Sequence, residues 1–151
     1  MLFRSSNYGS LVQPVRAMPE LALTTLEGQP AAVATLKGQW LLVVVAPAAC
    51  NAACDHQLFL QRQLREMLGK ERERVDKLWL ATGPGMPDAA LRAAAESAPG
   101  MHILRADRQA VAGWLAPEEG HALEDHLYIV DPMGDWMMRR SEEHTSELQS
   151  H

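Results

Sequence analysis

Residues 41–54 read LLVVVAPAACNAAC, and this short stretch decides the fold. Its first five residues form a continuous aliphatic run, which is typical of a central strand buried on both faces. Pro47 ends the run, and a helical pattern begins a few residues later. The stretch therefore predicts a strand that leads directly into a helix, with Cys50 at the junction and Cys54 one turn further along.

Outside this stretch, helical and extended patterns alternate. Apolar residues three and four positions apart predict a helix over 51–68, with Gly69 as its stop signal and the polar Gln61, Arg62, Arg65 and Glu66 on its outer face. The other predicted elements are strands over 75–82, 101–104 and 127–130, helices over 88–98 and after Asp107, and a hairpin strand over 135–139. This order predicts an α/β, thioredoxin-like fold with a mainly parallel central sheet, flanking helices and the last helix of that fold missing.

Composition limits the classes of function. Apolar residues make up 47% of the 151 residues and charged residues 22%, which suits a single globular domain with a real core. The net charge of −5 argues against a nucleic-acid partner, because nucleic-acid binding needs a basic face. No run of residues reaches the roughly 18 apolar positions of a membrane span.

Both ends of the chain are interpreted as foreign to the protein. Residues 140–150 match the translation of a widely used sequencing adapter, and residues 1–5 match the translation of its partner. This interpretation divides the chain into adapter-derived residues 1–5, an extended lead-in over 6–39 with a short hairpin around 27–28, a truncated thioredoxin-like domain over 40–139, and adapter-derived residues 140–151. We therefore expect the chain to be a fragment of a protein that continues beyond both ends.

The two cysteines are the candidate functional residues. Cys50 and Cys54 form a C-x3-C motif at the start of the predicted helix, where unpaired N–H groups and the helix dipole favour a thiolate. Residues four positions apart lie on one helix face, so the two sulfurs can converge. The motif is compatible with a structural disulfide, a redox pair, or two ligands for a soft metal such as Cu(I).

Three segments together resemble the Sco (Sco/SenC) family of thioredoxin-like proteins: the strand over 41–46, the C-x3-C motif, and the late segment LYIVDPMG over 127–134. The chain is most similar to a divergent, membrane-anchored proteobacterial group. This resemblance implies copper binding and assembly of cytochrome c oxidase, with an oxidase subunit or another copper chaperone as the partner. It also implies a place on the periplasmic face of the inner membrane, held by a single N-terminal anchor that this fragment lacks.

The resemblance further implies a ligand set. Sco proteins hold copper with both cysteines and a distant histidine, and the nearest match to that histidine is His126, which follows Asp125. The implied metal ligands are therefore Cys50, Cys54 and His126. His126 lies six residues before Pro132, closer than in the family pattern, and the proline that usually follows the first cysteine is replaced by Asn51.

Three functions remain open from the sequence. The first is a Sco-like copper-binding and thiol-redox assembly factor, and the second is a metal-free thiol–disulfide oxidoreductase with Cys50 as the attacking and Cys54 as the resolving thiol. The third is a non-catalytic assembly protein that docks on its partners. Only the second is an enzyme, and the absence of a proline just before Leu127, where oxidoreductases of this fold carry a cis-proline, argues against it.

Overall fold

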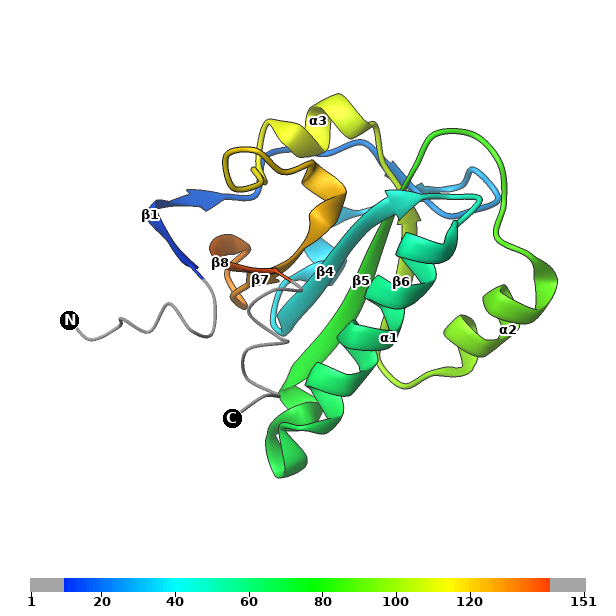
Figure 1. Ribbon diagram of the computed structural model, residues 1–151, viewed down its shortest axis with the longest axis horizontal. Helices are drawn as coiled ribbons and strands as arrows, with labels where there is room; N and C mark the ends of the chain where they lie inside the picture. The colour runs from blue at the N-terminus through cyan, green and yellow to red at the C-terminus, as the bar shows by residue number, and fades with distance from the viewer. Residues whose placement is uncertain (1–9, 142–151) are drawn as a thin grey trace.

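The structure is a computed structural model that describes residues 10–141, with one mixed eight-stranded sheet flanked by helices on both faces (Figure 1). The strands are β1 (Ser10–Ala17), β2 (Leu23–Thr24), β3 (Pro30–Ala31), β4 (Trp40–Pro47), β5 (Val75–Thr82), β6 (Met101–Arg105), β7 (His126–Val130) and β8 (Asp135–Ser141). The α-helices are α1 (Ala52–Glu66), α2 (Ala89–Ser97) and α3 (Arg108–Ala112). Short 3-10 helices are η2 (Val33–Leu36), η3 (Gly69–Arg74) and η4 (Leu123–Asp125).

The sheet is parallel only at its centre. Its strand order is β1-β8-β7-β4-β5-β6-β2-β3, in which β4, β5 and β6 run parallel and the remaining neighbours pair antiparallel. The thioredoxin-like α/β class is confirmed, but the sheet is mixed rather than mainly parallel. The difference arises because the lead-in contributes three strands, and each of them pairs antiparallel at an edge of the sheet.

Alternation along the strands separates two cores. In β4, Val43 and Val45 point to the face that α3 covers, whereas Val44 and Ala46 point to the face that α1 covers. The first core contains the aromatic side chains of Trp114, Tyr128 and Trp136, and the second contains Cys54. Because β4 is buried on both faces, a continuous aliphatic run is the pattern that this strand requires.

The predicted central elements agree closely with the observed ones. The strand β5 occupies the predicted residues 75–82, and the helix predicted over 51–68 runs as α1 from Ala52 to Glu66 and then tightens into η3. The predicted hairpin around 27–28 connects β2 and β3, where Gly28 adopts a φ of 94° that an L side chain would disfavour. The strand β1 was not predicted, because its partner β8 lies at the other end of the chain.

The terminal segments are only partly described. Strand β8 extends into the segment interpreted as foreign, since Arg140 pairs with Leu127 in the β7–β8 ladder. Residues 1–9 and 142–151 lie outside the described residues, so the interpretation of both ends as adapter-derived stays a prediction. Within residues 10–141, no helix combines the length and the apolar character that crossing a membrane requires.

Candidate functional site

The site begins where the central strand β4 turns into α1. The backbone N–H of Ala48 donates to the carbonyl of Thr82 at 2.8 Å, which ties the turn to the end of β5. The N–H of Cys50 then donates to the carbonyl of Pro47 at 2.9 Å. Cys50 has a φ of 56°, and among the described residues it is the only non-glycine residue with positive φ. The left-handed conformation costs a non-glycine residue about 1–3 kcal/mol, and such strain concentrates at functional sites.

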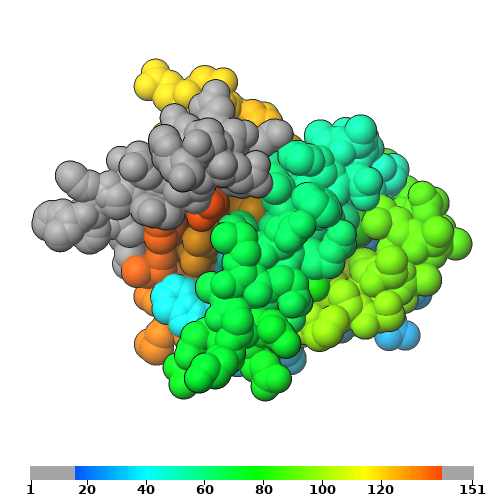
Figure 2. Space-filling view, turned by 60° about the horizontal axis from the view of Figure 1, so that its bottom comes forward, coloured from blue at the N-terminus to red at the C-terminus, as the bar shows by residue number. Residues whose placement is uncertain are grey.

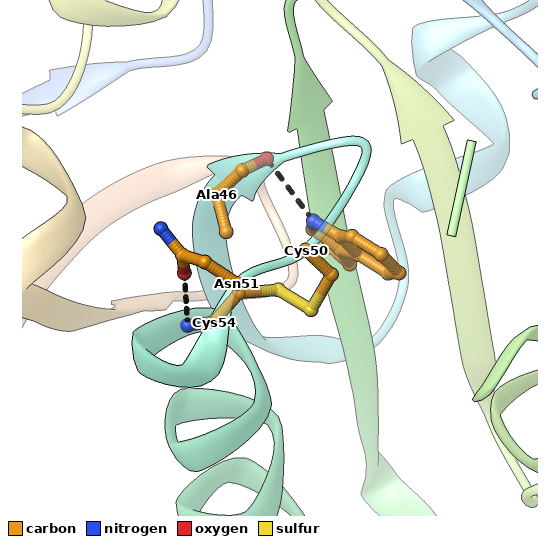
Figure 3. The surroundings of a disulfide bond; sticks show 5 residues. Ala46, Cys50, Asn51 and Cys54 are labelled. Atoms are coloured by element: carbon orange, nitrogen blue, oxygen red, sulfur yellow. Dashed lines mark hydrogen bonds between the residues drawn. A yellow bond between two sulfur atoms is a disulfide. The ribbon is translucent and has the colours of Figure 1, made fainter. Parts of the chain in front are cut away.

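The two cysteines are joined in a disulfide (Figure 3). Their Cα atoms lie 5.2 Å apart, in the range that this bond requires. Cys54 is only 2% exposed, whereas Cys50 is partly exposed at the junction. The two residues therefore differ in exposure, and Cys50 is the one that reaches the surface.

Asn51 caps α1 between the two cysteines. Its side-chain oxygen accepts a hydrogen bond from the backbone N–H of Cys54 at 2.8 Å, as Figure 3 shows. This bond satisfies one of the donors that every helix start leaves unpaired. Cys54 consequently sits in the first turn of α1 and Cys50 immediately precedes the cap, so both sulfurs lie near the positive end of the helix dipole.

The disulfide packs against side chains of the central sheet. Trp79 is fully buried, and its indole N–H donates to the carbonyl of Ala46 at 3.2 Å, drawn as a dashed line in Figure 3. Trp79, Cys54 and Ala46 belong to one apolar cluster, against which Cys50 packs. The strand end that precedes the cysteines is thus fixed by both packing and a hydrogen bond.

A small pocket opens beside the buried sulfur. It has a volume of about 220 Å³ and is lined by Ala46, Pro47, Asn51, Ala53, Cys54, Gln57 and Glu124. The Gln57 amide donates to the backbone carbonyl of Asp125 at 3.2 Å, which links α1 to η4. The pocket thus brings Glu124 of η4 to the same wall as Cys54.

The charge of Glu124 is balanced by an arginine. Arg108 donates from Nε and from a terminal nitrogen to the two oxygens of Glu124, at 2.6 and 3.0 Å. This hydrogen bonding holds the pKa of Glu124 below its ordinary value and raises the pKa of Arg108 above its own. The ion pair keeps Glu124 ionised and offsets its charge.

His126 does not join the two cysteines. The strand alternation of β7 places His126 on the same face as Tyr128, whereas Leu127 packs in the cluster that contains Cys54. The His126 ring is 1% exposed, and its Nε2 accepts a hydrogen bond from the backbone N–H of Glu118 at 3.1 Å. Its Nδ1 is buried without a hydrogen-bond partner. Burial lowers the pKa of His126, which favours the neutral ring.

Copper is the metal that the resemblance implies. Three ligands would have to converge, but Cys50 and Cys54 are bonded to each other and His126 faces the other side of the sheet. Within residues 10–141, no group of three or more His, Cys, Asp or Glu side chains is arranged to hold a metal ion. The residues as arranged here do not form a three-ligand copper site, and the role of His126 as a ligand stays a prediction.

Sequence reasoning identified the two cysteines and missed their neighbours. An asparagine directly before a helical pattern is a capping signal, and it could have identified Asn51. Gln57 and Glu124 carry no such signal, because they approach the disulfide only through the packing of η4 against the start of α1. The Arg108–Glu124 pair likewise depends on a contact between distant segments.

Comparison with known proteins places this site in context. A family model described as "Transmembrane-like, thioredoxin-like, C-terminal domain" matches residues 40–148. No curated protein matches the chain. The matched segment begins with β4 and includes the disulfide, α1 and every later strand through β8.

Solved structures with the same fold include several Sco proteins. Copper-bound ScoI from Bradyrhizobium japonicum has a TM-score of 0.58 at 18% identity, covering 89% of this chain and 98% of its own. A SCO1/SenC family lipoprotein from Bacillus anthracis str. Ames has a TM-score of 0.63 at 16% identity, covering 92% and 96%. BsSco, a Sco-family cytochrome c oxidase assembly protein with a disulfide switch, has a TM-score of 0.55 at 15% identity, covering 93% and 95%.

At these identities the likeness concerns the fold. The Sco-type thioredoxin fold predicted from the sequence is confirmed, including a cysteine pair at the junction of a buried strand and a helix. Bound copper, cytochrome c oxidase assembly and a lipoprotein are named in the descriptions of the neighbouring structures.

Proposed function

This chain belongs to the family of transmembrane-like, thioredoxin-like C-terminal domains, and we propose that it is a Sco-like assembly factor for cytochrome c oxidase that works through a reversible disulfide between Cys50 and Cys54. The observation that carries this proposal is the unequal pair of sulfurs at the start of α1. Cys50 is accessible and conformationally strained, whereas Cys54 is buried. This asymmetry suits an attacking and a resolving thiol.

The chemistry of the pair is thiol–disulfide exchange. In the reduced protein, the Cys50 thiolate attacks one sulfur of a disulfide on the partner protein, forming a mixed disulfide and releasing the partner's first thiolate. The Cys54 thiolate then attacks the Cys50 sulfur, which closes the disulfide observed here and releases the second thiolate. The partner gains two electrons, the two thiolates take protons from solvent, and a dithiol reductant later returns the Cys50–Cys54 pair to its reduced form.

Cu(I) as cargo is the second candidate function. Two thiolates are soft ligands that select Cu(I), and after reduction both sulfurs remain within one helical turn of each other. The copper-bound state of a neighbouring Sco structure favours this candidate. His126 as a third ligand would require β7 to present its other face.

The neighbouring structures also suggest a partner and a cellular location for this domain. An oxidase subunit or another copper chaperone is the proposed partner, because the neighbouring BsSco is an oxidase assembly protein. The family description includes a transmembrane-like character, and one neighbour is a lipoprotein. We propose that the domain works on the periplasmic face of the inner membrane, held there by an N-terminal anchor.

The redox proposal is tested by the reduction potential and by trapping. We expect the pair to equilibrate with a glutathione or dithiothreitol buffer at a potential above about −300 mV, the range of labile rather than structural disulfides. Cys54→Ser should accumulate a mixed disulfide with a small aromatic disulfide faster than Cys50→Ser, because it leaves the accessible thiol. A pair that resists reduction throughout this range, or equal trapping rates in both variants, would overturn the proposal.

The copper candidate is tested separately. The reduced chain would be titrated anaerobically with Cu(I) against a competing chelator, alongside Cys50→Ser, Cys54→Ser and His126→Ala. One-to-one binding that both serine variants lose would support two-sulfur cargo binding, and weakening in His126→Ala would identify the third ligand. Binding no stronger than that of the serine variants would exclude copper as cargo.

A further inference from the structure

A groove between α1 and α2 is lined by a buried lysine that the proposed thiol chemistry does not use. The groove has a volume of about 380 Å³, within the range of about 300–1,000 Å³ that small-molecule sites occupy. It begins at Ala52, the first residue of α1, and reaches the face of β5 beneath both helices. Figure 2 shows α1 (blue-green) and α2 (yellow-green) side by side on this face of the molecule.

Small side chains on α2 create the space. Ala94 and Ala95 of α2 and Ala98, which directly follows it, line the groove, and α2 has no buried residue of its own. Larger residues in these positions would close the gap between the two helices. The apolar part of the lining is completed by Leu58, Phe59, Leu91 and Met101.

Lys77 on β5 supplies a cation to the floor of this groove. Its residue is only 3% exposed, and it shares the lining with Gln61 of α1. Within residues 10–141, no hydrogen bond or ion pair holds the Lys77 ammonium. The Gln61 amide nitrogen is already used, since it donates to the carbonyls of Leu42 and Leu78 at 2.7 and 3.1 Å. Lys77 therefore places an ammonium without a hydrogen-bond or ion-pair partner among the described residues at the wall of the groove.

The charged side chains around Lys77 do not neutralise the positive charge of its ammonium. Burial and the nearby Arg65 and Arg62 lower the pKa of Lys77. Glu66 acts in the opposite direction, but its two carboxylate oxygens face Arg65 and Arg72 at 4.0 and 3.8 Å. A lysine that lines a cleft and has a perturbed pKa and no protein counter-ion marks a candidate site for an anionic ligand.

We propose that the groove between α1 and α2 binds a small organic monocarboxylate with a short apolar chain, whose carboxylate pairs with Lys77. The single buried cation matches one negative charge, and the alanine and leucine side chains match a hydrocarbon chain. Arg62 stands exposed at the rim, where it favours the approach of an anion, while Asp55 at the other end of the groove disfavours a second negative charge. A phosphate dianion or a dicarboxylate fits this balance less well.

Octanoate is a suitable probe, with 1-octanol as its uncharged counterpart and inorganic phosphate as the bare anion. Binding to the intact oxidised chain would be measured by calorimetry and by NMR. Lys77→Met removes the charge while keeping an unbranched side chain, and Lys70→Met is the matched control, because Lys70 is exposed on η3. Ala95→Leu fills the groove and leaves the lysine in place, so it tests the same site without altering the cation.

We expect one octanoate site, weakened about tenfold or more by Lys77→Met and by Ala95→Leu and unchanged by Lys70→Met. Circular dichroism would verify that each variant is folded. Octanol binding as tightly as octanoate, phosphate competing equally with octanoate, or octanoate binding unaffected by Lys77→Met would each overturn the proposal. Absence of octanoate binding at millimolar concentration would overturn it as well, and none of these results depends on whether the cysteine pair is redox-active.

Discussion

The side-chain oxygen of Asn51 accepts a hydrogen bond from the backbone N–H of Cys54 at 2.8 Å. Asn51, which directly follows Cys50, therefore caps the helix that carries Cys54. Asn51→Ala removes this cap and should lower the free energy of unfolding by about 1 kcal/mol, whereas Asn51→Asp keeps an equally good acceptor. Urea unfolding of the oxidised variants measures both values. An Asn51→Ala variant as stable as the original chain would mean that another group replaces the cap.

The position of Asn51 beside the two cysteines also predicts an effect on the pKa of the reduced thiols. Asn51→Asp places a negative charge beside both sulfurs and should raise the pKa of the reduced thiols, because a nearby like charge disfavours the thiolate. The thiolate absorbance of the reduced chain, followed against pH, gives the pKa directly. Asn51→Ser caps without charge and serves as the control. Equal thiol pKa values in the Asp and Ser variants would contradict the expectation.

The left-handed backbone of Cys50 makes glycine the better replacement. Cys50→Ala and Cys50→Gly both remove the disulfide, but only alanine keeps a Cβ atom at a φ of 56°. Cys50→Gly should therefore be less destabilised than Cys50→Ala, by about 1 kcal/mol, if the turn keeps its conformation. Chemical unfolding of both variants under reducing conditions provides the comparison. A more stable alanine variant would indicate that the turn relaxes once the disulfide is gone.

The sequence predicts those structural elements that neighbouring residues determine, and it does not predict contacts between distant segments. The strand and helix around the cysteines follow from residues 41–54 alone, because burial on both faces and a helix start leave direct marks on the sequence. The pairing of β1 with β8 does not, since nothing within either strand encodes a partner more than a hundred residues away.

The outer face of α1 illustrates a second limit. Gln61 and Arg65 were expected to face solvent, and that expectation was wrong: they are 1% and 6% exposed. Arg65 donates from Nε to the carbonyl of Val75 at 2.7 Å, and the Gln61 amide serves two strand carbonyls. Polar side chains on a helix satisfy backbone groups of the sheet beneath it, and periodicity cannot distinguish such residues from solvated ones. The side of the sheet on which His126 lies likewise depends on the register between β7 and β4, which no local pattern encodes, and its role as a ligand stays a prediction.

His126 should make the folded state sensitive to acid. Its pKa is lowered in the folded protein by burial, so the unfolded chain binds the proton more tightly. Stability is therefore full above the unfolded value near pH 6.5 and falls as the pH drops through the window between that value and the lower folded pKa. Urea unfolding across this window should show the loss.

Substitution by glutamine isolates that effect. The His126→Gln side chain can still accept the N–H of Glu118 but does not titrate, so its stability should depend less on pH over the same window. His56→Gln, at an exposed position on α1, is the matched histidine-to-glutamine control at another place in the chain. Parallel pH profiles for the original chain and the His126→Gln variant would assign the acid sensitivity to other groups.

Lys77 should lower the stability of the unliganded protein. Because its folded pKa lies below the ordinary value of 10.5, the unfolded chain binds the proton more tightly, and the cost of burying the charge is fully present at neutral pH. Stability of the original chain should rise as the pH increases through the window between the folded pKa and 10.5. Lys77→Met should be more stable than the original chain at neutral pH and should lack this rise, since an apolar side chain replaces an unpaired buried charge. Lys70→Met, at an exposed position, should match the original chain at every pH. Urea unfolding at neutral and alkaline pH decides the question: a destabilised Lys77→Met variant would mean that the ammonium contributes favourably to the fold, and the lysine would then need no ligand to explain its position.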